Sequence, residues 1–212
     1  MKRAGNTGKA TRRKAGAAEG EMGAATERAG VTECTPPREL YREGEVPVLD
    51  ADIALPAGEA IPAAVGAYYR SLAAAYARGA RERLLPAARA ALLALPEERR
   101  RFGFRRFRLT VRGYAETRGS YLLVTRTAML ACGTVTRRRE VCEVFRLPDG
   151  RLTPPLLFLR EVCGGLPRGW RRFRHAEMTL SGGAATLTTA RGRTMRIPLP
   201  QGEEADGKSG KC

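Results

Sequence analysis

The segment 104–159 constrains the fold most tightly, because it contains strand-like stretches that end in a recognisable hairpin. Residues 143–153 have the sequence EVFRLPDGRLT, in which two β-rich arms flank Pro-Asp-Gly. Proline presets φ, aspartate bonds its own backbone and glycine accepts positive φ, so this tripeptide predicts a tight turn. The chain is therefore expected to contain an antiparallel sheet.

Period-two alternation predicts further strands. Over 106–114, Phe107, Leu109 and Val111 alternate with arginines and a threonine, which indicates a sheet with one buried and one solvated face. The solvated face is expected to carry a ladder of arginines. The remaining expected pieces are strands over 121–131 and 137–147, a short helix or covering turn over 156–162, and a terminal hairpin or small meander over 177–180, 184–189 and 194–199.

A helix is expected to start at Pro62, after a short β-like piece over 46–53. That piece carries Asp50 and Asp52, which alternate along a strand face that we expect to be solvated. Apolar residues at three- to four-residue spacing predict one stripe of the helix against a sheet. Pro86 is expected to break or kink the helix, which then continues over 87–95. The stripe consists of Val65, Tyr69, Leu72, Tyr76 and Ala80.

These pieces predict an α/β fold of the α+β kind, with a long kinked helix packed on a mainly antiparallel sheet or meander. At 212 residues with 43% hydrophobic content, the chain can bury one ordinary core, so we expect a single domain. Residues 39–200 form that domain. Residues 1–38 are a basic tail with few large apolar side chains and 201–212 are a charged, glycine-rich tail, so both are predicted to be disordered.

The formal charge of +16 leaves +13 on residues 39–200, since the first 38 residues contribute eight minus four and the last twelve contribute two minus three. Every basic residue of that domain is an arginine. Such a surface suits phosphate or anionic-glycan contact, because guanidinium groups bind oxyanions as a planar fork. The alternative is a compositional origin, because arginine, alanine and glycine share GC-rich codons.

No run approaches the ~18 consecutive apolar residues of a membrane span, and the charged opening differs from a secretory signal. The chain as written is therefore expected to be cytoplasmic. Its five cysteines lack metal-type spacing and are expected to be reduced. Cys132 and Cys142 lie in strand-like context, which favours small buried side chains over reactive thiols.

The order of these pieces resembles the RsiV-like family of uncharacterised domains over approximately residues 40–200. The resemblance rests on YYRSL at 68–72, RERLLP at 81–86, the FRLPDGRLT hairpin at 145–153, MTL at 178–180 and IPL at 197–199. It implies an α/β domain with a non-enzymatic sensing or binding role, commonly on the outer side of bacterial membranes. An extracytoplasmic location would then require an upstream segment. We transfer no ligand-binding residue, because the turn at 131–135 lacks the histidine that members often carry.

No catalytic constellation is visible in the sequence. Its single histidine, His175, lies among arginines and is expected at the surface or half-buried, and no metalloprotease or serine-hydrolase motif occurs. Gly202–Ser209 satisfies the letters of a phosphate-binding loop, but only three residues follow, too few for the helix that such a loop opens. We therefore expect a non-enzyme without cofactor or metal.

Arginines interleaved with aromatic residues supply the remaining functional signal. They could contact nucleic acid, with guanidinium groups on phosphates and rings under bases, or they could cover the solvated face while the rings enter the core. The leading expectation is a binding or sensing domain for a polypeptide or other extended ligand, such as a protein or cell-envelope component. The alternative is nucleic-acid binding. The candidate anion- or ligand-binding residues are Arg105, Arg106, Arg108, Arg112, Arg171, Arg172 and Arg174.

Overall fold

The computed structural model describes residues 33–34, 38–58 and 60–200. Its strands are β1 (Glu33–Cys34), β2 (Glu39–Glu43), β3 (Val46–Pro56), β4 (Phe107–Arg118), β5 (Tyr121–Cys132), β6 (Val135–Arg146), β7 (Arg151–Thr153), β8 (Glu177–Ser181), β9 (Ala184–Thr188) and β10 (Thr194–Pro198). Its helices are α1 (Ala63–Gly79), α2 (Leu85–Leu93), α3 (Glu97–Gly103) and α4 (Pro155–Val162), with a π-helical turn η1 (Ala80–Leu84) and a 3-10 turn η2 (Trp170–Phe173). The fold is of the α+β kind, as the sequence predicts.

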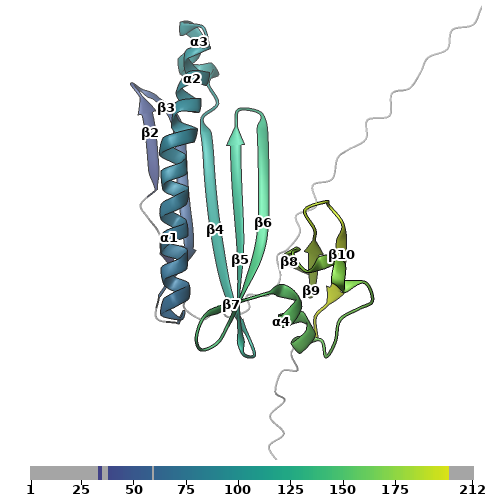
Figure 1. The fold of residues 1–212 in the computed structure, drawn as a ribbon. Coiled ribbons are helices and arrows are strands. Elements are labelled where there is room, and N and C mark those ends of the chain that lie inside the picture. The colour runs from purple at the N-terminus through teal and green to yellow at the C-terminus, as the bar shows by residue number, and fades with distance from the viewer. Residues whose placement is uncertain (1–32, 35–37, 59, 201–212) are drawn as a thin grey trace, which may run out of the picture.

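A large sheet forms the centre of the molecule, in the order β1-β3-β4-β5-β6-β7, with β2 also paired to β3 (Figure 1). Every pair in it is antiparallel except β3 and β4, which run parallel. A parallel pair needs a long crossover, and here the helical run from α1 to α3 supplies it. The sheet is therefore mainly antiparallel, as the sequence predicts, and the parallel β3–β4 pair makes it mixed.

The helical run covers one face of the large sheet (Figure 1). The predicted stripe of α1 packs there, with Val65, Tyr69 and Ala80 buried and the other two members half-buried. The hairpin tip seals the start of the helix. At Gly150, which has φ of +69°, a Cβ atom would lie 2.9 Å from Val65 Cγ2 and 3.0 Å from Pro62 Cβ, so only glycine fits.

The helical run changes its hydrogen bonding just before Pro86, where the sequence predicts a break or kink. The amide of Leu85 donates to Ala80 O, five residues earlier, and Pro86 then occupies the first turn of α2. Proline lacks an N–H donor, and its ring crowds the carbonyl four residues earlier. A π-helical turn at this point lets the helix continue past the proline.

The opposite face of the large sheet, here called the open face, is covered only over part of its length by α4 and the small sheet β10-β9-β8 (Figure 1). A second hydrophobic core lies between the open face on one side and α4 with the small sheet on the other. Phe158, Leu159, Met178 and Leu187 are fully buried there against Leu123 of β5 and its neighbours. The large sheet therefore separates two hydrophobic clusters.

Two features of the first 38 residues belong to the folded part. β1 pairs with Leu55 and Pro56 at the end of β3, and Arg38 binds the carboxylate of Asp50 on β3. The rest of the predicted N-terminal tail, the predicted C-terminal tail and the Gly202–Ser209 motif lie outside the described residues. Within the described part of the chain, no helix is long and apolar enough to cross a membrane.

Candidate functional site

The outer edge of β6 is the first component of the candidate site. β7 is only three residues long and pairs with Val144, Phe145 and Arg146. No described strand pairs with residues 135–143 on that side, although the same residues pair with β5 on the other. We call residues 135–143 the β6 edge.

The direction of the main-chain groups on the β6 edge follows from two hydrogen bonds at its end. Arg146 O accepts from Gly150 N on the β7 side at 2.8 Å, whereas Leu147 N donates to Ser120 O on the β5 side at 2.8 Å. Successive residues of a strand alternate in this direction. The amides and carbonyls of even-numbered residues therefore point outward from the β6 edge, namely those of Thr136, Arg138, Glu140 and Cys142.

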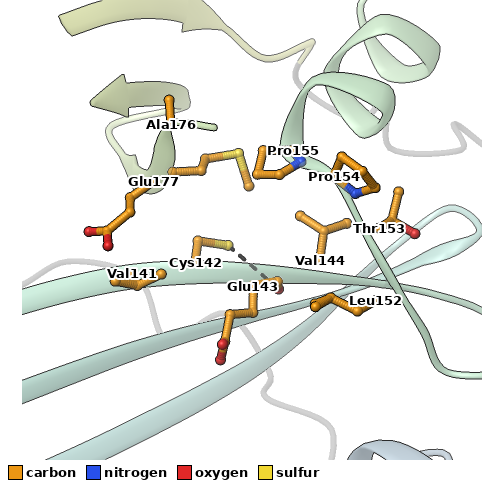
Figure 2. Close-up of a pocket in the computed structure, with 11 residues that line it drawn as sticks. Val141, Cys142, Glu143, Val144, Leu152, Thr153, Pro154, Pro155, Ala176 and Glu177 are labelled. Carbon is orange, nitrogen blue, oxygen red and sulfur yellow. Dashed lines mark hydrogen bonds between the residues drawn. The ribbon is translucent and has the colours of Figure 1, made fainter. Parts of the chain in front are cut away.

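An apolar hollow of about 310 Å³ adjoins the β6 edge, at the point where β7 ends (Figure 2). Cys142 and Val144 point from β6 toward Pro155 and Ala176, whereas the carboxylate of Glu143 points away from the hollow. The apolar hollow is lined by Val141, Cys142, Glu143, Val144, Leu152, Thr153, Pro154, Pro155, Ala176, Glu177 and Met178. A side chain lying opposite Cys142 on an added strand would share the face of Cys142 and enter this hollow.

Cys142 contributes an apolar surface to the hollow. Its side chain is buried, its thiol is free, and burial raises its pKa to about 12. A thiol with such a pKa stays protonated and behaves as a small hydrophobic group. This arrangement agrees with the predicted role of Cys142, while Cys132 is half-buried and also free.

Positive charge gathers along the β6 edge. Arg137, Arg138 and Arg139 are consecutive and exposed. Arg138 pairs with Glu140 at 2.7 Å, and Arg139 pairs with Glu177 at the rim of the apolar hollow. Exposed pairs of this kind contribute little to stability and open easily. The edge therefore offers guanidinium groups to a ligand that carries carboxylates.

The other face of β6 is fixed to α1 by a polar cluster. Glu143 accepts hydrogen bonds from Tyr68 Oη at 2.7 Å and from Tyr69 Oη at 2.8 Å. Burial, followed by the hydrogen bond to Glu143, raises the pKa of Tyr68 to about 12, so the phenol remains a donor. Arg126 donates to Tyr76 Oη and lies 3.8 Å from Glu143. These contacts hold β6 in place next to α1.

The arginine ladder predicted over 106–112 lies on the open face, where carboxylates of β3 lie beside its guanidinium groups. Asp50 is 1% exposed and accepts two hydrogen bonds from Arg38, at 2.8 and 2.6 Å, while Arg106 and Arg108 lie 3.9 and 3.7 Å from it. The hydrogen bonds from Arg38 hold the pKa of Asp50 below its usual range. The expectation that Asp50 lies on a solvated strand face is wrong, because these arginines cover it.

Asp52 repeats this arrangement two residues further along β3. Arg112 binds it through two hydrogen bonds, at 2.9 and 2.5 Å, and these bonds lower the pKa of Asp52. Arg105 is exposed just before β4. Four candidate ligand-binding arginines thus lie along one part of the sheet, and three of them lie beside carboxylates of β3.

The other predicted group lies beside the small sheet. Arg171 and Arg172 are in η2 and Arg174 follows it, next to the exposed His175. Together with Arg191 and Arg193 they line a second hollow of about 350 Å³. Arg191 and Arg193 were not predicted from the sequence, because their only local signal is the glycine between them.

The described residues contain no group of three or more His, Cys, Asp or Glu side chains that could hold a metal ion. The chain was compared with protein-family models, with curated proteins and with solved structures, and no match was found.

Proposed function

We propose that this protein is a polypeptide-binding domain that captures an extended segment by strand addition at the β6 edge. The observation that carries the proposal is the row of outward main-chain groups at Thr136, Arg138, Glu140 and Cys142, which lies directly beside the apolar hollow. Strand addition uses main-chain hydrogen bonds for affinity and pockets under alternate side chains for selectivity. Both components are present at this edge.

The ligand strand would continue the sheet from the point where β7 stops. Pairing with residues 136–142 requires about seven ligand residues, which span roughly 23 Å in the extended form. The ligand residue opposite Cys142 would place its side chain in the apolar hollow, and an aliphatic side chain suits that lining. Residues opposite Arg137 and Arg139 would carry carboxylates, and the carboxylate opposite Arg139 would replace Glu177 as the partner of that arginine.

The charge of the edge also selects against a second copy of the chain. An antiparallel β6–β6 pair centred on Arg138 would place Arg138 opposite itself and Arg137 opposite Arg139. Like charges directly opposite one another destabilise a strand pair. Charged edges of this type prevent self-association. An acidic partner would instead place carboxylates opposite these arginines, so no like charges would meet.

Binding of a model peptide to the full chain tests this proposal. The probe is a capped peptide of alternating glutamate and valine, which presents carboxylates to Arg137 and Arg139 and a valine to the hollow. We expect saturable binding, measured by fluorescence anisotropy of a labelled peptide, and an alternating lysine–valine peptide should not bind. Equal binding of the two peptides, or of neither, would contradict the proposal.

A pair of variants at one position separates main-chain pairing from charge. Arg138→Pro removes an outward N–H without touching the pairing to β5, since proline is tolerated on a strand edge whose N–H faces solvent. Arg138→Ala removes the same charge and keeps the N–H. The proline variant should bind the peptide at least about fivefold more weakly than the alanine variant does, because the loss of one hydrogen bond costs about 1 kcal/mol of binding free energy. Identical affinities would refute strand addition.

The resemblance of residues 40–200 to RsiV-like domains supports a binding or sensing role of the same kind. Nucleic-acid binding is the alternative function. The pairing of Arg106, Arg108 and Arg112 with carboxylates of β3 disfavours it at the β4 ladder. The arginines beside the small sheet differ, because they surround a hollow of their own.

A further inference from the structure

Five arginines and one histidine surround a hollow between η2 and the turn that joins β9 to β10. Its lining consists of Arg171, Arg172, Arg174, His175, Thr189, Ala190, Arg191 and Arg193, with a volume of about 350 Å³. None of these residues is acidic. We call this site the arginine hollow.

The arginines of this hollow differ from those of β4 in their partners. Among the described residues, none of the five forms an ion pair with a carboxylate, whereas Arg38, Arg106, Arg108 and Arg112 all lie within 4.0 Å of one. Five positive charges around one concavity repel one another. An anion placed among them would interact favourably with all five at once.

The backbone on both sides of the hollow is held in place. In the β9–β10 turn, Gly192 N donates to Thr189 O at 2.9 Å, and Arg193 N donates to Thr189 Oγ1 at 3.1 Å. On the other side, η2 is anchored by the buried ring of Phe173. The arginines therefore project from two fixed segments, which lowers the entropic cost of gathering them around a ligand.

We propose that the arginine hollow binds a compact anion that carries several phosphate groups. Guanidinium groups bind phosphate oxygens bidentately, and several phosphates in one ligand match several guanidinium forks. A volume of about 350 Å³ admits a small polyphosphate, or the few backbone phosphates of a strand that passes over the hollow. This site is separate from the β6 edge and does not depend on the polypeptide-binding proposal.

The chain carries its own reporter for this site. Trp170 is the only tryptophan of the sequence, and the guanidinium of Arg174 lies over its ring at 5.9 Å from the centroid. A ligand that draws Arg174 toward the hollow would alter the surroundings of the indole. Intrinsic fluorescence of the unlabelled full chain therefore reports occupancy.

The experiment is a titration of the full chain with inorganic tripolyphosphate at about 0.1 M salt, followed by Trp170 fluorescence and checked by calorimetry. We expect saturable binding that is tighter than that of orthophosphate and weakens as salt is raised. The double variant Arg191→Ser/Arg193→Ser, which leaves the tryptophan and η2 untouched, should bind at least about tenfold more weakly. Absence of saturable binding would overturn the proposal.

A matched variant distinguishes a built site from general attraction to a basic protein. Arg78→Ser/Arg99→Ser removes two positive charges from exposed helical positions outside the hollow. It should bind tripolyphosphate nearly as well as the unchanged chain, and a loss equal to that of Arg191→Ser/Arg193→Ser would refute the hollow. A single-stranded oligonucleotide, added as competitor, identifies the source: displacement of tripolyphosphate assigns the hollow to a nucleic-acid backbone, and persistence assigns it to a free polyphosphate.

Discussion

Replacement of Asp50 by asparagine tests whether the β4 arginines are structural. Asp50 is 1% exposed and faces three guanidinium groups, so its carboxylate is the hub of this part of the open face. The asparagine side chain would keep the shape of the aspartate and one carbonyl acceptor. Its NH₂ group would face a donor of Arg38, and two donors cannot bond each other.

The magnitude follows from the geometry. Arg38 donates two hydrogen bonds to Asp50, and hydrogen bonds to charged groups contribute about 1.5–3 kcal/mol each. One of these bonds is lost in the variant and the other becomes a weaker one to a neutral acceptor. Arg106 and Arg108, at 3.9 and 3.7 Å, add about 1 kcal/mol each at most because their side chains are well solvated. Relief of the buried charge offsets part of the loss, so we expect Asp50→Asn to lower the free energy of unfolding by about 3 kcal/mol.

The assay is urea denaturation at neutral pH, followed by circular dichroism, with Glu82→Gln as the control for an exposed carboxylate. The control should change stability by less than about 0.5 kcal/mol. Because the pKa of Asp50 is lowered by folding, its contribution is fully present above the unfolded pKa of about 4 and is lost as pH falls through the native pKa. The difference between the variant and the unchanged chain should therefore shrink in acid. A neutral-pH effect below about 1 kcal/mol, or one independent of pH, would show that the ionised Asp50 does not stabilise the fold through these arginines.

Three further changes follow from single contacts. Gly150→Ala should destabilise the fold by about 2–4 kcal/mol, because it adds a clash to a positive φ, whereas Gly164→Ala, with φ of +66° and open space around it, should cost only about 1 kcal/mol; denaturant titration compares them. Tyr69→Phe should lower stability by about 2 kcal/mol, since its hydroxyl bonds a half-buried carboxylate on β6, and an unchanged unfolding midpoint would contradict that role. Burial raises the pKa of Cys142 to about 12, so mass spectrometry after brief alkylation at pH 8 should find Cys163 modified before Cys142, and the reverse order would show that the thiol is accessible.

The local elements of this fold were predictable because their signals lie in consecutive residues. Pro148-Asp149-Gly150 forms a turn between β6 and β7, and the alternation over 106–114 falls largely within β4. The parallel pairing of β3 with β4 was not predictable in the same way, because about fifty residues of mainly helical chain separate the two strands. Pairing across such a distance is decided by the packing of the crossover rather than by a local pattern.

The candidate sites, like the parallel strand pair, depend on contacts between distant parts of the chain. Asp50 is buried because Arg38, Arg106 and Arg108 approach it from other parts of the chain, which no alternation of residues within β3 could indicate. The β6 edge depends on the neighbouring strands: its own sequence is that of an ordinary strand, and no described strand pairs with its outer side because β7 ends early. Basic residues interleaved with aromatic residues predicted Arg171, Arg172 and Arg174 as ligand-binding residues. Arg191 and Arg193 come from a later turn, and only the folded chain brings them beside this group.

Residue-resolved amide hydrogen exchange, measured with and without the glutamate–valine peptide, tests strand addition at the β6 edge residue by residue. We expect slower exchange at the outward amides of Thr136, Arg138, Glu140 and Cys142 when the peptide is bound. Amides of the intervening residues, which already face β5, should change little. Peptide binding that leaves the four outward amides unprotected would contradict strand addition at the β6 edge.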